Sequence, residues 1–153
     1  MLVRCLYASR VATPLPALVL DEILVQSHRN NPRRGITGLL CFTSDIFVQV
    51  LEGGRDEVND LYNAIIRDSR HSQVRMLVYE EITERRFGSW SMGQVDAKAV
   101  NPSLLLKYSK AASLDPFAMT GQATMALLME LVATGAITGR SSVSDGPVSA
   151  QGG

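Results

Sequence analysis

The sequence contains few of the residues from which metal sites and disulfide frameworks are built. Its 153 residues include two cysteines and two histidines. Cys5 and Cys41 lack metal-ligand spacing, and His28 and His71 lie far apart without cysteine or carboxylate partners at ligand spacing. A bound metal is therefore not predicted. We interpret each cysteine as a small core residue on a strand.

The sequence also lacks an excess of charge and a long apolar run. Its formal net charge is zero and no basic stripe stands out, which argues against a nucleic-acid-binding protein. The small cluster Arg29, Arg33 and Arg34 fits an ordinary solvated surface as well as an anion contact. The longest apolar run, residues 125–133, is too short to span a bilayer, and the first residues show no signal-peptide pattern. We therefore expect a cytoplasmic protein without a membrane partner.

Ordinary acid–base or covalent catalysis leaves no trace in the sequence. A nucleophile with a neighbouring base is not visible. The pair Gly53-Gly54 is not a phosphate loop, because neither a Gly-Lys-Ser/Thr sequence nor a repeated glycine spacing follows it. The chain is accordingly predicted not to be an enzyme.

The order of strand and helix patterns predicts an α+β fold. The expected elements are the strand 3–9, the helix 17–29, the strands 36–43 and 46–53, the helix 56–68 and the strand 74–82. This β-α-β-β-α-β order is the ferredoxin-like pattern, in which two helices pack on one face of the sheet. Pro14 and Pro16 are expected to open the first helix, and Asn30-Asn31-Pro32 to end it. The segment 87–92 is expected to add an edge strand.

The remainder of the chain predicts a helical appendage and a tail. Asn101-Pro102 marks the end of the first unit, and residues 104–112 and 116–135 form two helical patterns. The leucines and methionines of these helices are expected to cover the open face of the sheet. Residues 140–153 are rich in serine and glycine and are predicted to be disordered. The chain is thus divided into a domain 1–97, a helical cap 98–139 and a tail 140–153.

One polar side chain, Gln49, is placed inside the predicted core. Alternation puts Phe47, Gln49 and Leu51 on one face of their strand, and both faces of the strand are apolar. A buried carboxamide lowers stability unless its donors and acceptor find partners. Either the protein supplies these partners or a bound ligand does.

Other polar residues are expected around the helix-covered face of the sheet. They are Tyr7, Asn30, Asn31, Asp68, Arg70 and His71. Two helices on a sheet can hold a flat, mainly apolar ring between them, with amides meeting its polar edge. The sequence therefore indicates a small-molecule site between the two helices.

Four spaced segments resemble the signature segments of BLUF domains, which are blue-light sensors that use flavin. They are Tyr7, the stretch Asn31-Pro32-Arg33-Arg34-Gly35-Ile36-Thr37-Gly38, the stretch Phe47-Val48-Gln49-Val50-Leu51-Glu52-Gly53, and Arg86-Phe87-Gly88-Ser89-Trp90-Ser91-Met92. The resemblance covers about residues 1–97. Any one segment is a weak signal, whereas the four together in the family's order are specific.

The resemblance implies a non-covalently bound flavin, usually FAD, with FMN or riboflavin as alternatives. By this match Asn31 would pair with the ring carbonyl O4 and N3–H, because a carboxamide offers a donor and an acceptor side by side. Arg70 would donate to O2, and Ile23 and Ile65 would enclose the ring. Gln49 would sit between the Tyr7 hydroxyl and the flavin. Asn30, Asp68 and His71 complete the implied cofactor-binding set.

The resemblance also implies a photochemical function. An electron and a proton would pass from Tyr7 to the excited flavin and return, and Gln49 would rotate or tautomerise. The change would reach the segment that carries Trp90 and Met92. Because no effector domain follows, the output would go to a separate signalling protein, for example a cyclic-dinucleotide enzyme or a transcription regulator. Family members of this layout also imply a homo-oligomer.

Simpler interpretations exist for each residue taken alone. Gln49 would be a satisfied structural amide, Tyr7 a core aromatic, and Ile23 and Ile65 ordinary core residues. The simpler reading for the rest is a helix stop at Asn30-Asn31, surface charges at Asp68, Arg70 and His71, and packing residues at Trp90 and Met92. Two other functions remain open: a ferredoxin-like small-molecule regulatory module without photochemistry, and a flavin-binding scaffold that has lost switching.

Overall fold

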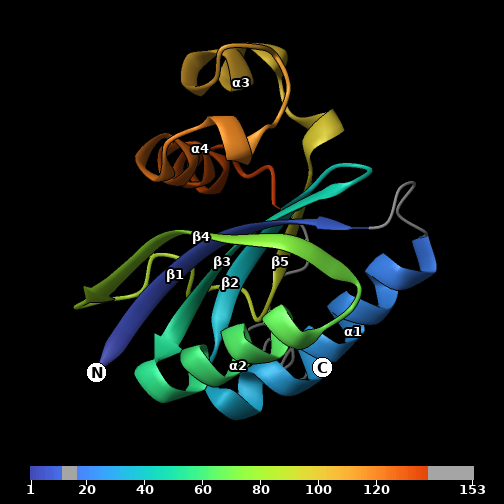
Figure 1. Cartoon of the computed structure of the whole chain (residues 1–153). Coiled ribbons are helices and arrows are strands. Elements are labelled where there is room, and N and C mark those ends of the chain that lie inside the picture. Colours follow the sequence, from blue (N-terminus) through green and yellow to red (C-terminus); the bar gives the residue numbers. More distant parts are fainter. Residues whose placement is uncertain (12–16, 138–153) are drawn as a thin grey trace, which may run out of the picture.

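A five-stranded sheet lies between two layers of helices (Figure 1). The computed structural model describes residues 1–11 and 17–137, so Pro14, Pro16 and the tail 140–153 lie outside the described residues. The strands are β1 (Leu2–Val11), β2 (Thr37–Phe42), β3 (Ile46–Gly54), β4 (His71–Ile82) and β5 (Gly93–Asp96). The helices are α1 (Ala17–Arg34), α2 (Arg55–Arg67), α3 (Pro102–Tyr108) and α4 (Gly121–Thr134), with short 3₁₀ turns η1 (Ala97–Ala99) and η2 (Pro116–Ala118). None of these helices has both the length and the hydropathy that a membrane span needs.

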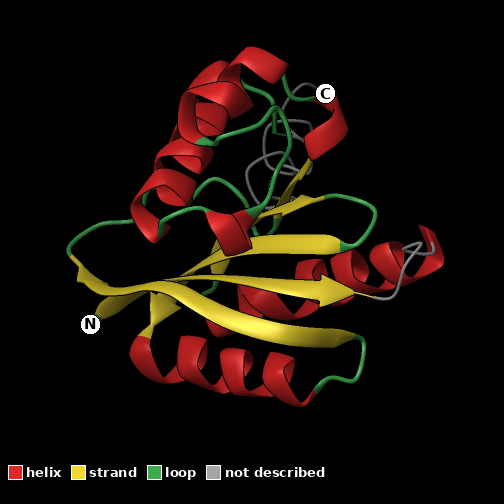
Figure 2. Cartoon of the chain, turned by 45° about the horizontal axis from the view of Figure 1, so that its top comes forward, coloured by secondary structure: helices red, strands yellow, loops and turns green. Residues whose placement is uncertain are grey.

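The strand order is β4-β1-β3-β2-β5. β3 runs antiparallel to β1 and β2, β4 runs antiparallel to β1, and β5 runs parallel to β2. Helices α1 and α2 cover one face, and α3 and α4 lie on the other (Figures 1 and 2). The predicted ferredoxin-like α+β fold with an added edge strand and C-terminal helices is confirmed. β4 begins at His71 rather than at residue 74, because β1 extends to Val11 and pairs with it.

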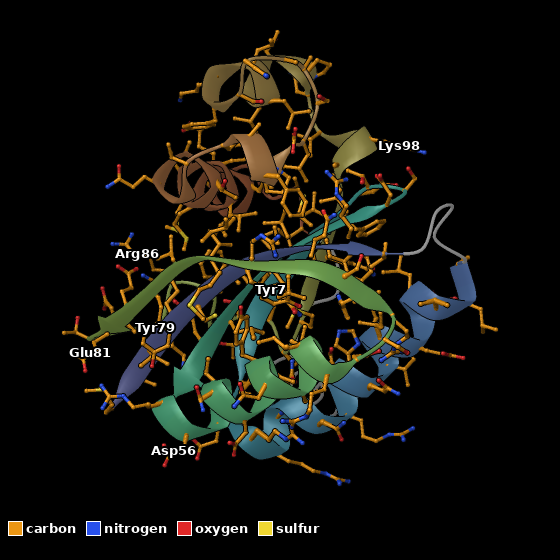
Figure 3. All side chains as sticks on the ribbon, viewed as in Figure 1. Tyr7, Asp56, Tyr79, Glu81, Arg86 and Lys98 are labelled. Atoms are coloured by element: carbon orange, nitrogen blue, oxygen red, sulfur yellow. The ribbon has the colours of Figure 1, made fainter. Side chains whose placement is uncertain are left out.

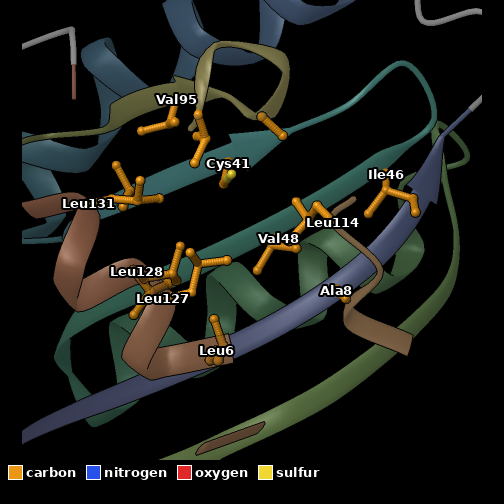
Figure 4. Packing of buried hydrophobic residues seen from close by; sticks show 14 of the residues in the cluster. Leu6, Ala8, Cys41, Ile46, Val48, Val95, Leu114, Leu127, Leu128 and Leu131 are labelled. Carbon is orange, nitrogen blue, oxygen red and sulfur yellow. The ribbon is translucent and has the colours of Figure 1, made fainter. Parts of the chain in front are cut away.

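Both faces of the central strand β3 are buried, as alternation predicts. Phe47 and Leu51 belong to an apolar cluster with α1 and α2, whereas Val48 belongs to a second cluster beneath the C-terminal helices (Figure 4). The second cluster is completed by Leu127, Leu128 and Leu131 of α4. Cys5 and Cys41 are free and buried, one in each cluster. Burying one large apolar side chain stabilises a fold by about 2 kcal/mol, so the C-terminal helices stabilise the sheet substantially.

The predicted end of the first helix at Asn30-Asn31-Pro32 is wrong, because α1 continues to Arg34. Pro32 lacks one backbone donor and so removes one helical hydrogen bond, a loss that is tolerated within the last turns. The helix ends in a Schellman motif at Gly35, whose φ is +66°. The N–H of Gly35 donates to the Pro32 carbonyl at 3.3 Å, and that of Ile36 donates to the Asn31 carbonyl at 2.9 Å. Asn31 therefore stays on the helix.

The predicted edge strand at residues 87–92 is also wrong, because this segment is a loop and β5 begins only at Gly93. Phe87 and Met92 are fully buried, which gives the segment its strand-like pattern. Its backbone forms isolated hydrogen bonds and not the continuous hydrogen-bond ladder of a strand. The Phe87 N–H donates to the Glu52 carboxylate at 2.7 Å, and the Trp90 carbonyl accepts from Gly38 at 3.0 Å.

The two C-terminal helices differ in extent from the predicted ranges. α3 ends at Tyr108 and not at residue 112, and the range 116–135 is divided into η2 and α4. Thr120 separates the two, because its Oγ1 accepts from the Ala123 N–H at 3.0 Å and caps α4. A Cβ added at Gly121 would lie 2.4 Å from the Leu77 carbonyl oxygen, so the helix start rests closely on β4.

One carboxylate, that of Glu52 on β3, is fully buried and fixes the loop after β4. Its Oε2 accepts from Nε and Nη2 of Arg4 at 2.8 and 2.7 Å. Its Oε1 accepts from the backbone N–H groups of Arg86 and Phe87 at 3.0 and 2.7 Å. Arg4 also pairs with Glu80 at 2.7 Å. The buried charge is thus paired and hydrogen-bonded, the condition under which a fold tolerates it.

Replacing Glu52 by glutamine tests this anchor. The variant leaves Arg4 without its buried partner, so we expect Glu52→Gln to lower the free energy of unfolding by about 3 kcal/mol. Urea unfolding followed by circular dichroism measures the change. Glu81→Gln is the control, since Glu81 forms an exposed pair with Arg55, and the loss should be at most about 1 kcal/mol. An unchanged urea midpoint for Glu52→Gln would show that the carboxylate is not an anchor.

Candidate functional site

A cavity lies between the sheet and helices α1 and α2. It encloses about 680 Å³ when the solvent-filled space at its open mouth is counted. All nine side chains predicted to contact a cofactor line it: Tyr7, Ile23, Asn30, Asn31, Gln49, Ile65, Asp68, Arg70 and His71. The fold thus brings these residues together from β1, α1, β3, α2 and the start of β4.

Helical spacing explains most of the cavity wall. In α1 the lining positions 23, 26, 27, 30, 31 and 34 recur every three or four residues, and positions 61, 64, 65 and 68 do so in and after α2. Six lining residues are absent from the predicted set: Gln26, Ser27, Arg34, Phe47, Leu61 and Ala64. Counting in helical steps from Ile23 and Ile65 finds those on the helices, and strand alternation from Gln49 finds Phe47.

Tyr7 and Gln49 lie directly opposite each other on β1 and β3. Opposed residues of an antiparallel pair share one face of the sheet, so both side chains reach the cavity. The Tyr7 hydroxyl donates a hydrogen bond to Oε1 of Gln49. Tyr7 is 1% exposed and Gln49 6% exposed. Figure 3 labels Tyr7 between the sheet and the layer of α1 and α2. The protein itself therefore supplies one of the partners that the buried amide of Gln49 requires.

The phenol of Tyr7 is held in its neutral form. Burial raises its pKa, and the nearby Cys5, Tyr62 and Asp68 raise it further. The ring of Tyr62 meets the Tyr7 ring edge-on, with centroids 5.7 Å apart. Because the phenol keeps its proton at neutral pH, its hydroxyl acts as the donor towards Gln49.

Three side chains tie the segment Ser91-Met92 to the cavity wall. Nε2 of Gln49 donates to Sδ of Met92 at 3.2 Å, and Nδ2 of Asn31 donates to the Ser91 carbonyl at 2.7 Å. Nε2 of His28 lies 2.9 Å from the Met92 carbonyl. His28 was not predicted here, although it stands three residues before Asn31 on the same helix. The segment that these contacts hold leads directly into β5, which begins at Gly93.

A charged pair and a neutral imidazole form another part of the wall. Nη2 of Arg70 donates to the Asp68 carboxylate at 2.6 Å and lies 3.4 Å from Oε1 of Gln26. Their hydrogen bond lowers the pKa of Asp68 and raises that of Arg70, so both are ionised at neutral pH. Burial lowers the pKa of His71, whose Nδ1 lies 2.8 Å from Oγ of Ser9. These groups are partly buried in the wall and are not free surface charges.

Trp90 does not line the cavity. It is half-buried and packs against the apolar cluster beneath α4, whereas Met92 belongs to the cluster on the cavity side. A Cβ added at Gly93 would lie 2.6 Å from Ile137 and 3.0 Å from the Trp90 ring. The short segment from Trp90 to Gly93 thus contacts Gln49 of the cavity wall through Met92, and it contacts the second apolar cluster through Trp90.

The donor set of the cavity fits a flat heteroaromatic ring. Ile23, Leu61 and Ile65 give apolar walls from two helices. Among the described residues, Oδ1 of Asn31 and one of its two amide hydrogens have no partner, which leaves a donor and an acceptor side by side. A flavin ring has apolar faces and a complementary imide edge. Over residues 1–11 and 17–137, no group of three metal-ligand side chains is close enough to hold a metal ion.

Known proteins share this sequence pattern. The family model described as "BLUF: Sensors of blue-light using FAD" matches residues 2–93. The chain is 32% identical over 98 residues to the blue light- and temperature-regulated antirepressor BluF of Escherichia coli (strain K12), covering 64% of the chain and 24% of that protein. It is 38% identical over 88 residues to the photoactivated adenylate cyclase subunit alpha of Euglena gracilis. This match covers 58% of the chain and 9% of that protein. The chain therefore spans a quarter or less of the length of these relatives.

Solved structures share the fold over more of the chain. The dark state of BlrB, a BLUF protein, superposes with a TM-score of 0.73 at 33% identity, covering 88% of this chain and 96% of BlrB. The photo-activated state of BlsA superposes with a TM-score of 0.75 at 30% identity, and the match covers 86% of this chain and 94% of BlsA. Because the family model ends at residue 93, coverage of this extent includes part of the segment beyond it. Klebsiella pneumoniae BlrP1 with FMN and cyclic diGMP superposes with a TM-score of 0.64 at 29% identity, and the match covers 88% of this chain and 35% of BlrP1.

The family model matches more than half of the chain, and it does so over the segments that carry Tyr7, Asn31, Gln49 and Met92. The resemblance drawn from those segments is confirmed. A BLUF domain is a flavin-binding sensor and not a catalytic domain. This chain belongs to the BLUF family, the sensors of blue light that use FAD.

Proposed function

We propose that this protein senses blue light through a flavin bound non-covalently between α1 and α2, and that light changes the hydrogen bonds of Gln49. The position of Gln49 carries the proposal, since its amide lies between the Tyr7 hydroxyl and the Met92 sulfur at the cavity wall. The family description names FAD, and FMN is present in the BlrP1 structure. The ring site itself accepts any flavin.

The cavity residues have distinct roles in holding the ring. Asn31 would bind its imide edge with the free donor and acceptor of the carboxamide. Nη1 of Arg70 has no partner among the described residues and would donate to the second imide carbonyl, while Asp68 keeps the guanidinium in place. Ile23 and Ile65 would pack on the ring. Tyr7, Asn31 and Gln49 are buried, and the low dielectric constant at this end of the cavity would strengthen these hydrogen bonds.

The switch would depend on the pair Tyr7 and Gln49. A flavin bound here would supply, when excited by blue light, the acceptor for one electron and one proton. Tyr7 suits this role because its phenol is buried, neutral and hydrogen-bonded, so that an electron and the hydroxyl proton can leave together. Without that proton the bond to Oε1 of Gln49 is lost, and the amide is free to rotate or tautomerise. The proton and electron then return to Tyr7, and only the hydrogen-bond arrangement has changed.

The change would leave the site through Met92. In the arrangement described here Nε2 of Gln49 faces Sδ of Met92, so a rearranged amide removes this contact. Met92 is adjacent to Gly93, which packs between Trp90 and Ile137. Release of the Met92 side chain therefore alters the support of β5 and of the residues that follow α4.

The signal would pass to a separate protein in the cytoplasm. In this proposal residues 1–97 sense light, and residues 98–139 cap the sheet and meet a partner or a second copy of the chain. The partner would be a transcription regulator or a cyclic-dinucleotide enzyme. Two comparisons support these classes, since the Escherichia coli relative is an antirepressor and BlrP1 was solved with cyclic diGMP.

Colour and its response to light test the proposed function. Purified protein should be yellow from bound flavin, and blue light should shift its absorption slightly to the red. The shift should decay in darkness, because no net redox product is formed. A colourless protein that takes up no added flavin would contradict the proposal and favour a regulatory module of another kind. A yellow protein without the shift would point to a flavin-binding scaffold.

Substitution of the two switch residues tests the mechanism. Tyr7→Phe removes the phenolic proton and Gln49→Leu removes the amide, so each variant should bind flavin but lose the light-induced shift. Absorption spectra before and after illumination measure it. Tyr62→Phe is the matched control: Tyr62 contacts the Tyr7 ring but has no hydrogen bond to Gln49, and this variant should keep the shift. A normal shift in Tyr7→Phe or Gln49→Leu would rule out the assigned roles.

Met92→Leu tests the route from the site to β5. The replacement keeps the apolar volume at a cost below about 1.5 kcal/mol but removes the sulfur acceptor. Flavin binding and the absorption shift should persist. The difference between light and darkness in hydrogen exchange of the β5 amides should fall, as measured by mass spectrometry. Met125→Leu, at a partly buried position on α4, is the control. A wild-type exchange difference in Met92→Leu would exclude Met92 as the relay.

A further inference from the structure

The cavity carries one positive charge that no acidic residue of its wall neutralises. Its ionisable wall residues besides Tyr7 are Arg34, Asp68, Arg70 and His71. Asp68 and Arg70 neutralise each other through a hydrogen-bonded ion pair at 2.6 Å. His71 is neutral at pH 7 because burial lowers its pKa. Arg34 therefore gives the wall a net positive charge, although the flavin ring that the proposed function requires is neutral.

Arg34 stands at the open end of the cavity. Asn31, three residues earlier on the same helix, is 2% exposed, whereas the Arg34 side chain is exposed. Gln26 and Ala64 also line the cavity and are exposed, so they mark its mouth between the two helices. One helical turn is about 5.4 Å, so the wall passes from the buried amide to the exposed guanidinium within that length. Within residues 1–11 and 17–137, the Arg34 side chain has no hydrogen-bond or ion-pair partner.

The end of α1 does not by itself explain the position of Arg34. A basic residue in the last turn of a helix interacts favourably with the helix dipole, and Arg33 and Arg34 both occupy that turn. Arg33 is equally exposed but does not line the cavity. The dipole accounts for basic side chains in this turn, whereas a bound anion would account for the one that lines the cavity.

From this arrangement we infer that Arg34 binds the 5′-phosphate of the flavin, so that the site selects phosphorylated flavins, FMN or FAD, over riboflavin. The inference rests on the proposed function, because it assumes that the ring occupies the buried end. The ribityl chain must then extend towards the mouth, where FMN and FAD carry a phosphate and riboflavin only a hydroxyl. A guanidinium offers paired N–H groups that match two phosphate oxygens. Arg70 is excluded from this role by its bonds to Asp68.

Titration of flavin-free full-length protein with riboflavin, FMN and FAD tests the inference. Quenching of flavin fluorescence gives each Kd. Arg34→Gln should weaken FMN and FAD binding about tenfold, the change that corresponds to about 1.4 kcal/mol, and leave the Kd for riboflavin unchanged. The ratio of the riboflavin and FMN constants should then fall towards one. Arg33→Gln, the matched control, should keep the wild-type ratio. Added salt should reduce the preference in the wild type and not in Arg34→Gln.

Each contrary result has a separate meaning. Equal weakening of all three flavins by Arg34→Gln would overturn the inference, because the arginine would then only shape the cavity. An unchanged FMN constant in Arg34→Gln would overturn it while leaving the proposed function intact, and so would an equal loss in Arg33→Gln. If wild-type protein binds none of the three flavins, the proposed function fails and the inference falls with it.

Discussion

The buried carboxylate of Glu52 is the constraint on which the site depends. Gln49 finds an acceptor in Met92 only because the chain after β4 returns to β3. Glu52 fixes that return by accepting the backbone N–H groups of Arg86 and Phe87. A carboxylate of this burial destabilises the fold by several kcal/mol when its partners are missing, so the loop has little freedom to lie elsewhere. Glu52 and Gln49 are three positions apart on β3, so alternation places their side chains on opposite faces of the strand.

The partners of Gln49 would suit the change of hydrogen bonds that is proposed for its amide. A switch needs two states that differ by only a few kcal/mol. The Tyr7 hydroxyl serves as donor or acceptor, so it bonds to either end of the carboxamide. The thioether of Met92 is a weak acceptor, so little free energy is lost when the amide turns away from it. A backbone carbonyl in the place of the sulfur would hold the amide in one orientation.

Much of the fold and of the site follows from periodicity in the sequence. The errors arise where the same residue type is compatible with two local structures. Alternation around Gln49 places both faces of β3 correctly, and helical spacing leads to the cavity wall. Pro32 was predicted to stop α1, but the stop is Gly35, whose αL conformation closes the helix. Phe87 and Met92 are buried like strand residues, yet they anchor a loop. His28 was not predicted because its partner, the Met92 carbonyl, lies 64 residues away in the sequence. Arg34 was considered only within a basic cluster that fits a solvated surface as well as an anion contact.

The position of β5 explains why a change on one face of the sheet would reach helices on the other. The central strands β1 and β3 each have two neighbours and pack on both faces, so moving them breaks many contacts at once. β5 has four residues and, within the described sheet, the single neighbour β2. It follows directly after Met92 and begins at Gly93, against which Ile137 packs. An edge strand held by so few bonds is the part of the sheet that moves at the smallest free-energy cost. The proposed relay would therefore pass around the edge of the sheet and not through its core.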